Sequence, residues 1–126
     1  MQIYSVLIVD DDQNIRAISE MTLETDFDVY LAESGADCLI VAECEEPDLI
    51  LFDVKTPVMN GLPTLIMLRQ NPITVAIPVI LMSHETEWHA DELLRRRYRK
   101  LDTIGFIERT FDRRMAAQIR RLAAPR

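Results

Sequence analysis

The chain is poor in cysteine, and the two cysteines that it has are badly placed for a disulfide bond. Cys38 and Cys44 are six residues apart in a segment with helical spacing, so they would lie about 9 Å apart along the helix axis and on different faces. A disulfide requires a closer approach of the two side chains. The sequence therefore predicts free thiols and a reducing compartment.

Long apolar runs and an excess of positive charge are also missing. The longest uncharged apolar stretch near the start covers residues 3–9, without a preceding basic cluster, which argues against a signal peptide and a membrane span. The net charge of −7 disfavours direct binding to nucleic acid or to an anionic membrane surface. We therefore expect a cytoplasmic protein whose partner is another protein or a metal cation.

The chain does have enough apolar material for one domain. It has 126 residues, of which 48% are hydrophobic, and this suffices for a core of its own. It shows no internal repeat, low-complexity tract or second-domain boundary, so we expect residues 1–126 to form a single domain. An alternative left open is that residues 124–126 begin a linker in a longer protein.

Four apolar runs end on polar residues of the kind that phosphoryl chemistry uses. The runs cover residues 4–9, 49–52, 79–82 and 104–107, and they lead to Asp10, Asp11 and Asp12, to Asp53, to Ser83, and through Glu108 to Arg109. If these runs are neighbouring parallel strands, all those side chains fall on one edge of a sheet, where open α/β folds bind their ligands.

Segments with helical spacing separate the runs, and residues 29–32 supply a fifth strand. The apolar stripes are Ile15, Ile18 and Thr22; Ala36, Leu39, Ile40 and Cys44; Leu62, Leu65 and Ile66; and Phe111, Met115, Ile119 and Leu122. Strands that alternate with helices imply right-handed crossovers. The alternation therefore predicts a doubly wound α/β fold with five parallel strands and helices on both faces. For the strand order we expect the flavodoxin-like order 2-1-3-4-5, one of the common doubly wound orders.

Three aspartates would converge in this fold, because the strands before Asp10 and Asp53 are neighbours in that order. Crowded carboxylates repel one another, and a bound Mg²⁺, a hard cation that prefers oxygen ligands, relieves the repulsion. The plainer alternative is that Asp11 or Asp12 caps the helix that follows. For Asp12 alone we prefer that interpretation.

Asp53 opens a loop without helical pattern, so we expect its side chain to face a ligand. A carboxylate can attack phosphorus and form an aspartyl phosphate. Ser83 could donate a hydrogen bond to a phosphoryl oxygen, and Arg109 could pair with the same group. Taken singly, a turn serine and a solvated arginine are the commoner explanations, but their joint placement at strand ends favours the functional one.

The motifs resemble one known family along the whole chain. They are Ile8-Val9-Asp10-Asp11, Leu51-Phe52-Asp53 with Pro57 and Asn60-Gly61, the run Val79–Ser83, and residues 105–111. In order and spacing this pattern is similar to the receiver domain of two-component response regulators.

The resemblance implies that Asp53 accepts a phosphoryl group from a histidine kinase or a histidine phosphotransfer protein. It also implies that Asp10, Asp11, Asp53 and the backbone carbonyl of Lys55 hold Mg²⁺. Ser83 and Phe106 would move on phosphorylation and alter the surface of the fourth helix, fifth strand and fifth helix, which meets a downstream protein, an output domain or a second copy. Such a domain catalyses its own phosphotransfer and dephosphorylation but is not a metabolic enzyme.

The chain departs from the family at the phosphate pocket. Arg109-Thr110 replaces the usual Lys-Pro pair, and since a cis bond before threonine would cost roughly 2.5 to 4 kcal/mol, we expect a trans peptide there. Our hypothesis is that Arg109 still reaches Asp53 or its phosphate. His84 stands where the family usually has a small residue, and it either narrows the pocket or points to solvent.

Two further features bear on the output of such a domain. Lys55 and Glu85 should flank the pocket and influence hydrolysis of the aspartyl phosphate. A helix over residues 85–101 would be about one turn longer than the family's usual fourth helix, with acidic residues early and basic residues late. That polarity suits a solvated helix, and a basic docking patch or a dimer contact is the alternative.

Two rival functions remain. One is a phosphorylation-independent pseudo-receiver that serves as an interaction module because Arg109, Thr110 and His84 have altered the pocket. The other is a phosphohydrolase with Asp53 as nucleophile. Enzymes of the haloacid dehalogenase type need a second acid two residues after the nucleophile, whereas this chain has Lys55, so that rival ranks far behind.

Overall fold

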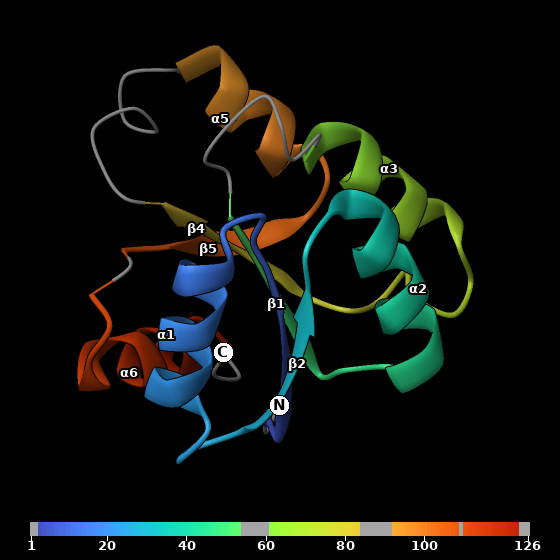
Figure 1. Ribbon diagram of the computed structural model, residues 1–126. Coiled ribbons are helices and arrows are strands. Elements are labelled where there is room, and N and C mark those ends of the chain that lie inside the picture. Colours follow the sequence, from blue (N-terminus) through green and yellow to red (C-terminus); the bar gives the residue numbers. More distant parts are fainter. Residues whose placement is uncertain (1–2, 54–60, 84–91, 109, 124–126) are drawn as a thin grey trace.

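The computed structural model describes residues 3–53, 61–83, 92–108 and 110–123. Within these ranges five strands alternate with five helices (Figure 1). In chain order they are β1 (Ser5–Val9), α1 (Gln13–Leu23), β2 (Asp28–Ala32), α2 (Gly35–Glu45), β3 (Leu49–Asp53), α3 (Gly61–Gln70), β4 (Val79–Ser83), α5 (Glu92–Arg99), β5 (Thr103–Glu108) and α6 (Arg113–Ala123). The predicted alternation is confirmed.

All five strands are parallel and form one sheet in the order β2-β1-β3-β4-β5, as predicted. In the register of the sheet, Val9 lies opposite Phe52, and Asp53 lies opposite Met82. The carboxyl ends of β1, β3 and β4 therefore meet at one edge. The strand order switches between β1 and β3. Open α/β folds bind their ligands at such a switch point, in the crevice outside the carboxyl ends of the strands.

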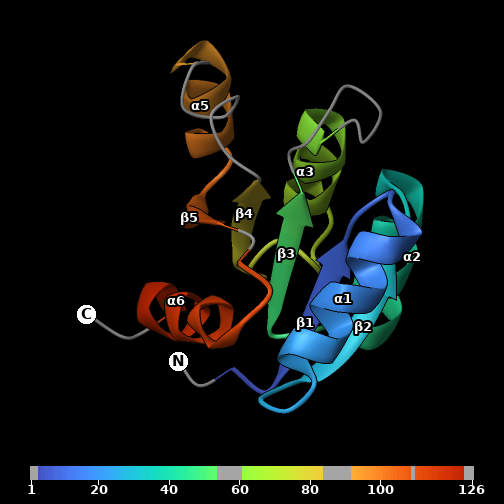
Figure 2. The same cartoon turned by 60° about the vertical axis from the view of Figure 1, so that its left-hand side comes forward.

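Helices cover both faces of the sheet, and strand side chains alternate between the two resulting cores. In Figure 2, α1 and α6 lie on one side of the strands. The core on that side contains Val6, Ile8, Leu49, Leu51, Ile80 and Met82, whereas the core under α2, α3 and α5 contains Leu7, Val9, Ile50, Phe52, Val79 and Leu81. Because β3 is buried on both faces, Asp53 is carried at the end of a fully buried strand.

The predicted apolar stripe is right for the residues within α6 but wrong for Phe111, which precedes that helix, and the stripes of three other helices are wrong in detail. In α6, Met115 and Ile119 are buried as expected, but Ile18, Ile40 and Ile66 are exposed by 42%, 62% and 43% of their surface. The buried residues include Ser19 and Leu23 in α1, Cys38 and Ala42 in α2, and in α3 the predicted Leu65 together with Leu68. In α1 and α2 small residues are among those buried, and they let the helices approach the sheet closely.

Both cysteines are free, as predicted; Cys38 is buried and Cys44 is exposed. The predicted helix over residues 85–101 is described only from Glu92, where α5 begins, and its earlier part lies outside the described residues. Among the described helices, none combines the length and the apolar character that a bilayer crossing needs.

Candidate functional site

The three aspartates come together at the edge of the sheet. Asp10 and Asp11 directly follow β1, Asp53 ends the neighbouring β3, and carboxylate oxygens of the three residues all lie within 4.8 Å of one another. Asp10 and Asp53 have no exposed surface, whereas Asp11 is exposed. The result is an acidic pocket, formed by these three residues, with a buried floor and one carboxylate at the surface.

Backbone contacts hold Asp10 in this position. The N–H of Asp12 donates to Oδ1 of Asp10 at 2.9 Å, and the N–H of Asp10 donates to the carbonyl of Ala32 at 3.1 Å. Arg16 closes the loop from the first turns of α1, because its Nη1 donates to the Asp10 carbonyl at 2.8 Å. The position of the Asp10 carboxylate is thus determined by hydrogen bonds of the fold and not only by repulsion from the neighbouring carboxylates.

Asp12 serves α1 as an N-cap, as we preferred from the sequence. Its Oδ1 accepts hydrogen bonds from the N–H groups of Asn14 at 2.8 Å and Ile15 at 3.1 Å. Capping of this kind satisfies donors that the helix itself leaves unpaired. The run of three aspartates therefore divides its work between the pocket and the helix start.

The donor set of the acidic pocket suits a hard divalent cation. Mg²⁺ binds oxygen at about 2.0–2.1 Å, so two ligand oxygens on one ion lie roughly 3 to 4 Å apart. The three carboxylates are already close to that separation. Two buried carboxylates beside a third would repel strongly without a counter-charge, so the residues present fit such an ion.

The remaining predicted site residues lie along the same edge as far as the structure describes them. Ser83 ends β4 and lies opposite Glu108 of β5, one residue beyond the partner of Asp53. Phe106 lies opposite Leu81 and is partly buried against the core under α2, α3 and α5. Lys55, His84, Glu85 and Arg109, with the trans bond expected after Arg109, lie outside the described residues.

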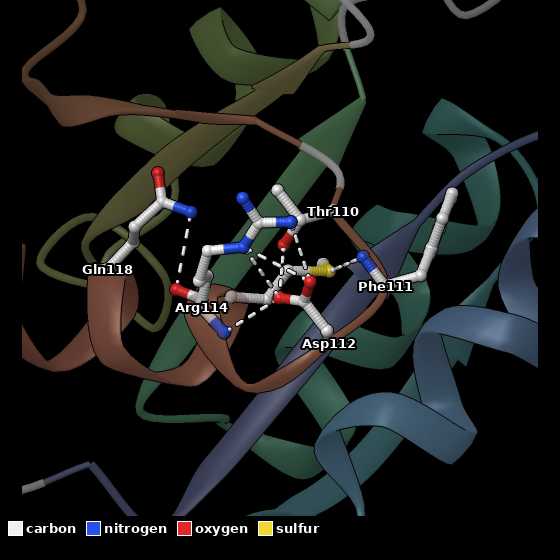
Figure 3. A network of polar contacts seen from close by, with 6 residues as sticks. Thr110, Phe111, Asp112, Arg114 and Gln118 are labelled. Atoms are coloured by element: carbon white, nitrogen blue, oxygen red, sulfur yellow. Dashed lines mark hydrogen bonds and ion pairs between the residues drawn. The ribbon is translucent and has the colours of Figure 1, made fainter.

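Thr110 takes part in the start of α6 instead of in a proline turn. Its Oγ1 donates to Oδ1 of Asp112 at 2.9 Å, and the same oxygen accepts from the N–H of Arg114 at 2.9 Å (Figure 3). The side chain of Arg114 bonds both carboxylate oxygens, the shortest contact being 2.7 Å. These bonds, that of the Arg114 side chain first, hold the pKa of Asp112 well below its usual range.

The backbone between Thr110 and α6 is sharply turned. Phe111 adopts a positive φ of 56°, and its N–H donates to the Sδ of Met115 at 3.3 Å. A left-handed conformation is costly for a bulky residue. The cap formed by Asp112 and these contacts hold the connection from β5 to α6 in place.

Tyr98 of α5 is a residue near the site that the sequence reasoning missed. Only 4% of it is exposed, and its hydroxyl lies where a Cβ on Gly61, the first residue of α3, would be. Burial, and then the negative charge of Asp53, raise the pKa of Tyr98 to about 12. The spacing of Leu94, Tyr98 and Leu101 was the available signal, since it places one tyrosine on an apolar stripe of a basic helix.

The fold, the acidic pocket and a match to a family model together identify the family of this chain. The chain belongs to the response regulator receiver domain family, whose model matches residues 6–119. The acidic pocket of Asp10, Asp11 and Asp53 is thus the acidic pocket of a receiver domain.

Two curated relatives illustrate the similarity. The chain is 34% identical to the alkaline phosphatase synthesis transcriptional regulatory protein PhoP of Bacillus subtilis over 83 residues, which are 65% of this chain and 34% of that protein. It is 33% identical to the transcriptional regulatory protein CpxR of Escherichia coli over 117 residues, which are 91% of this chain and 47% of that protein. The aligned part thus spans a third to a half of these relatives.

The fold is also similar to that of solved structures. The chemotaxis response regulator CheY4 of Vibrio cholerae superimposes with a TM-score of 0.79 at 24% sequence identity, and the match covers 96% of this chain and 99% of that one. At this level of identity the likeness establishes the fold.

Proposed function

We propose that this receiver domain is a phosphorylation-dependent switch in which Asp53 accepts a phosphoryl group from a histidine kinase or a histidine phosphotransfer protein. The observation that carries the proposal is the acidic pocket, in which a buried nucleophile candidate lies beside two further carboxylates. Membership of the receiver family, whose members work with histidine kinases, supports it. We further propose that residues 1–126 act as one domain in the cytoplasm.

In the transfer, a carboxylate oxygen of Asp53 attacks the phosphorus of a phosphohistidine. The new P–O bond forms as the P–N bond breaks, and the imidazole leaves with the electron pair and takes a proton from water. Asp10, Asp11, Asp53 and the Lys55 carbonyl would hold Mg²⁺, which when bound offsets the charge of the nucleophile and of the phosphoryl group.

The other pocket residues take supporting roles in this proposal. The Ser83 hydroxyl donates to a phosphoryl oxygen, and Arg109 supplies a fixed cation for the same group. Lys55, His84 and Glu85 flank the opening and set the rate at which water hydrolyses the aspartyl phosphate. Ser83 ends β4, and the other four residues follow the ends of β3, β4 and β5 in the sequence. We therefore expect all five to lie near one phosphoryl group.

The switch would act on the surface of α5, β5 and α6, which are the fourth described helix, the fifth strand and the fifth described helix. Ser83 ends β4 and Phe106 lies in the neighbouring β5, so a movement of the serine toward phosphate can be followed by the aromatic ring. The downstream partner is a separate protein or an output domain, and a homodimer through α5, β5 and α6 is the alternative.

Charge distribution indicates what kind of partner this surface accepts. Of the 14 lysines and arginines, all but Arg16, Lys55 and Arg69 lie in the last third of the chain. On α5 and its end, Arg96, Arg97, Arg99 and Lys100 are exposed. Although the chain has a net charge of −7, the side of the domain formed by α5, β5 and α6 is therefore rich in basic residues. A partner with acidic groups would associate with this side faster at low ionic strength.

Two observations favour this function over its two rivals. A pseudo-receiver that no longer uses phosphate has no need of three carboxylates in one pocket, because their repulsion destabilises the fold without a cation. A phosphohydrolase of the haloacid dehalogenase type would need an acid where Lys55 stands.

Intact-mass measurement tests the proposal. The protein is incubated with Mg²⁺ and acetyl phosphate, and we expect one phosphoryl group to add to the wild type and none to add to Asp53→Asn. The matched control is Asp48→Asn. Asp48 directly precedes β3, at the opposite end of that strand from Asp53, so its replacement should leave the addition unchanged. Absence of addition to the wild type, with donor and metal varied, would favour the pseudo-receiver.

A further inference from the structure

Tyr98 is the residue through which α5 is anchored to the body of the domain. Among the side chains of α5 that the structure describes, it is the buried one, while Glu92, Arg96, Arg97 and Arg99 are exposed. Its ring belongs to the core under α2, α3 and α5. A displacement of this ring would therefore also displace α5, the helix that carries it.

The backbone of the same residue connects α5 to β5. The carbonyl of Tyr98 accepts a hydrogen bond from the N–H of Leu101 at 3.0 Å and another from Oγ1 of Thr103 at 3.2 Å. Thr103 is the first residue of β5. The proposed output side consists of α5, β5 and α6. Tyr98 belongs to the first of these elements and contacts the second.

The hydroxyl of Tyr98 extends from this anchor toward the acidic pocket. It lies directly at Gly61, where a Cβ would overlap it and would also lie 3.2 Å from Cε1 of Phe52. Phe52 directly precedes Asp53, and Gly61 begins α3, the next described element after Asp53. The phenol is therefore placed between the N-terminus of α3 and the end of β3.

The chemistry of a phenol at this place is that of a neutral donor. The pKa of Tyr98, raised by burial and by the charge of Asp53, keeps the hydroxyl protonated at neutral pH. A buried O–H dipole interacts with a nearby anion more strongly than it would in water, because the local dielectric is low. Phosphorylation adds negative charge and acceptor oxygens, and Phe106 brings no hydroxyl of its own to meet them.

We propose that Tyr98 is a positioning residue that couples the charge at Asp53 to the placement of α5. The inference rests on the proposed function in so far as the phosphoryl group is the charge that changes. The hydroxyl follows the added charge, the ring moves with it, and α5 with the start of β5 is repositioned. Tyr98 thereby gives the acidic pocket a connection to the output side in addition to Ser83 and Phe106.

Hydrogen exchange of α5 amides tests the coupling without phosphate in its first arm. The peptide covering Glu92–Arg99 is followed by mass spectrometry in the wild type and in Tyr98→Phe, each with and without Asp53→Asn. We expect removal of the Asp53 charge to change α5 exchange by about threefold to tenfold in the wild type, the factor that one hydrogen bond is worth. In Tyr98→Phe the change should be largely lost.

The second arm adds acetyl phosphate and Mg²⁺, with intact mass read on the same samples. Tyr98→Phe should accept the phosphoryl group as the wild type does, yet its α5 exchange should not respond. Tyr30→Phe, which removes a hydroxyl from the opposite edge strand β2, is the control and should respond fully. A full α5 response in Tyr98→Phe in either arm would overturn the proposal.

A second variant keeps the test decisive if Tyr98→Phe folds poorly. Gly61→Ala displaces the hydroxyl while leaving the tyrosine in the chain, so it should also weaken the response of α5. If the wild type accepts no phosphoryl group, the proposed function fails, and the first arm alone then supports or overturns the coupling between Asp53 and Tyr98.

Discussion

Replacing Gly61 by alanine would place a methyl group where the Tyr98 hydroxyl lies. The new Cβ would overlap that oxygen and would lie 3.3 Å from Cζ of Tyr98 and 3.2 Å from Cε1 of Phe52. Overfilling a well-packed site costs about 1 to 3 kcal/mol. Gly61 is the first residue of α3, so alanine recovers only about half of the roughly 1 kcal/mol by which it is favoured over glycine inside a helix. We therefore expect a net loss of about 0.5 to 2.5 kcal/mol, or roughly 2 to 10 °C in melting temperature.

A double-mutant cycle tests the contact between Gly61 and the Tyr98 hydroxyl. In a Tyr98→Phe background the overlapping oxygen is gone, so Gly61→Ala should cost less than about 1 kcal/mol. The free energy of unfolding is measured by urea denaturation followed by circular dichroism. Gly105→Ala, whose Cβ would lie 2.7 Å from Leu122, is the control and should cost the same in both backgrounds. An equal cost of Gly61→Ala in both backgrounds would refute the contact.

Other contacts lead to further expectations. Cys44 should react with iodoacetamide in the native protein, whereas Cys38 should react only on unfolding, because burial raises its pKa to about 12; mass spectrometry of alkylated peptides checks this. Arg69→Ala should lower the free energy of unfolding by about 2 to 4 kcal/mol, since the guanidinium donates to four backbone carbonyls around α3, β4 and β5; urea denaturation measures it. The depressed pKa of Asp112 implies stabilisation that is present above its ordinary pKa near 4 and is lost as pH falls below it, so thermal melts of Asp112→Asn should depend less on pH in that range.

Each of these expectations has an outcome that would contradict it. Equal labelling of both cysteines in the folded protein would contradict the burial of α2 against the sheet. An unchanged unfolding curve for Arg69→Ala would show that its four carbonyl contacts do not stabilise the fold. Identical acid profiles for wild type and Asp112→Asn would remove the Asp112 cap from the account of α6.

The sheet and the acidic pocket could be predicted from the sequence because their determinants are local and repeated. Four of the five strands are short apolar runs that lead to a polar residue of the site, and the position of Asp53 after one of them fixes its place at the sheet edge. The alternation with helices predicts parallel strands, and the order 2-1-3-4-5 is one of the two common doubly wound orders. The convergence of Asp10, Asp11 and Asp53 then follows from register alone.

The buried faces of the helices could not be predicted in the same way. On α1 and α2 the residues nearest the sheet include Ser19, Cys38 and Ala42, while Ile18 and Ile40 are exposed. Reading hydrophobicity along the chain selects the large apolar residues. The choice of face depends instead on how closely each helix approaches the strands, which is a property of the assembled core.

Tyr98 illustrates the same limit at the site. Its contact with Gly61 depends on the rotation of α5 about its axis and on the start of α3, and neither is encoded in a local pattern. Thr110 is a second case, since the sequence identified it as a departure from Lys-Pro but not as a hydrogen-bond donor to Asp112. The contact of Tyr98 with Gly61 joins segments whose relative placement only the fold decides, whereas that of Thr110 with Asp112 is local and depends on the turn before α6.

The central claim is that Asp10, Asp11 and Asp53 share one divalent cation. Titration of isotopically labelled protein with Mg²⁺, followed by amide chemical shifts, tests it most directly. The account predicts one saturable set of shifts confined to the ends of β1 and β3, and its loss in Asp53→Asn. Weak, unsaturating shifts spread over the other acidic residues of the surface, unchanged in Asp53→Asn, would contradict it.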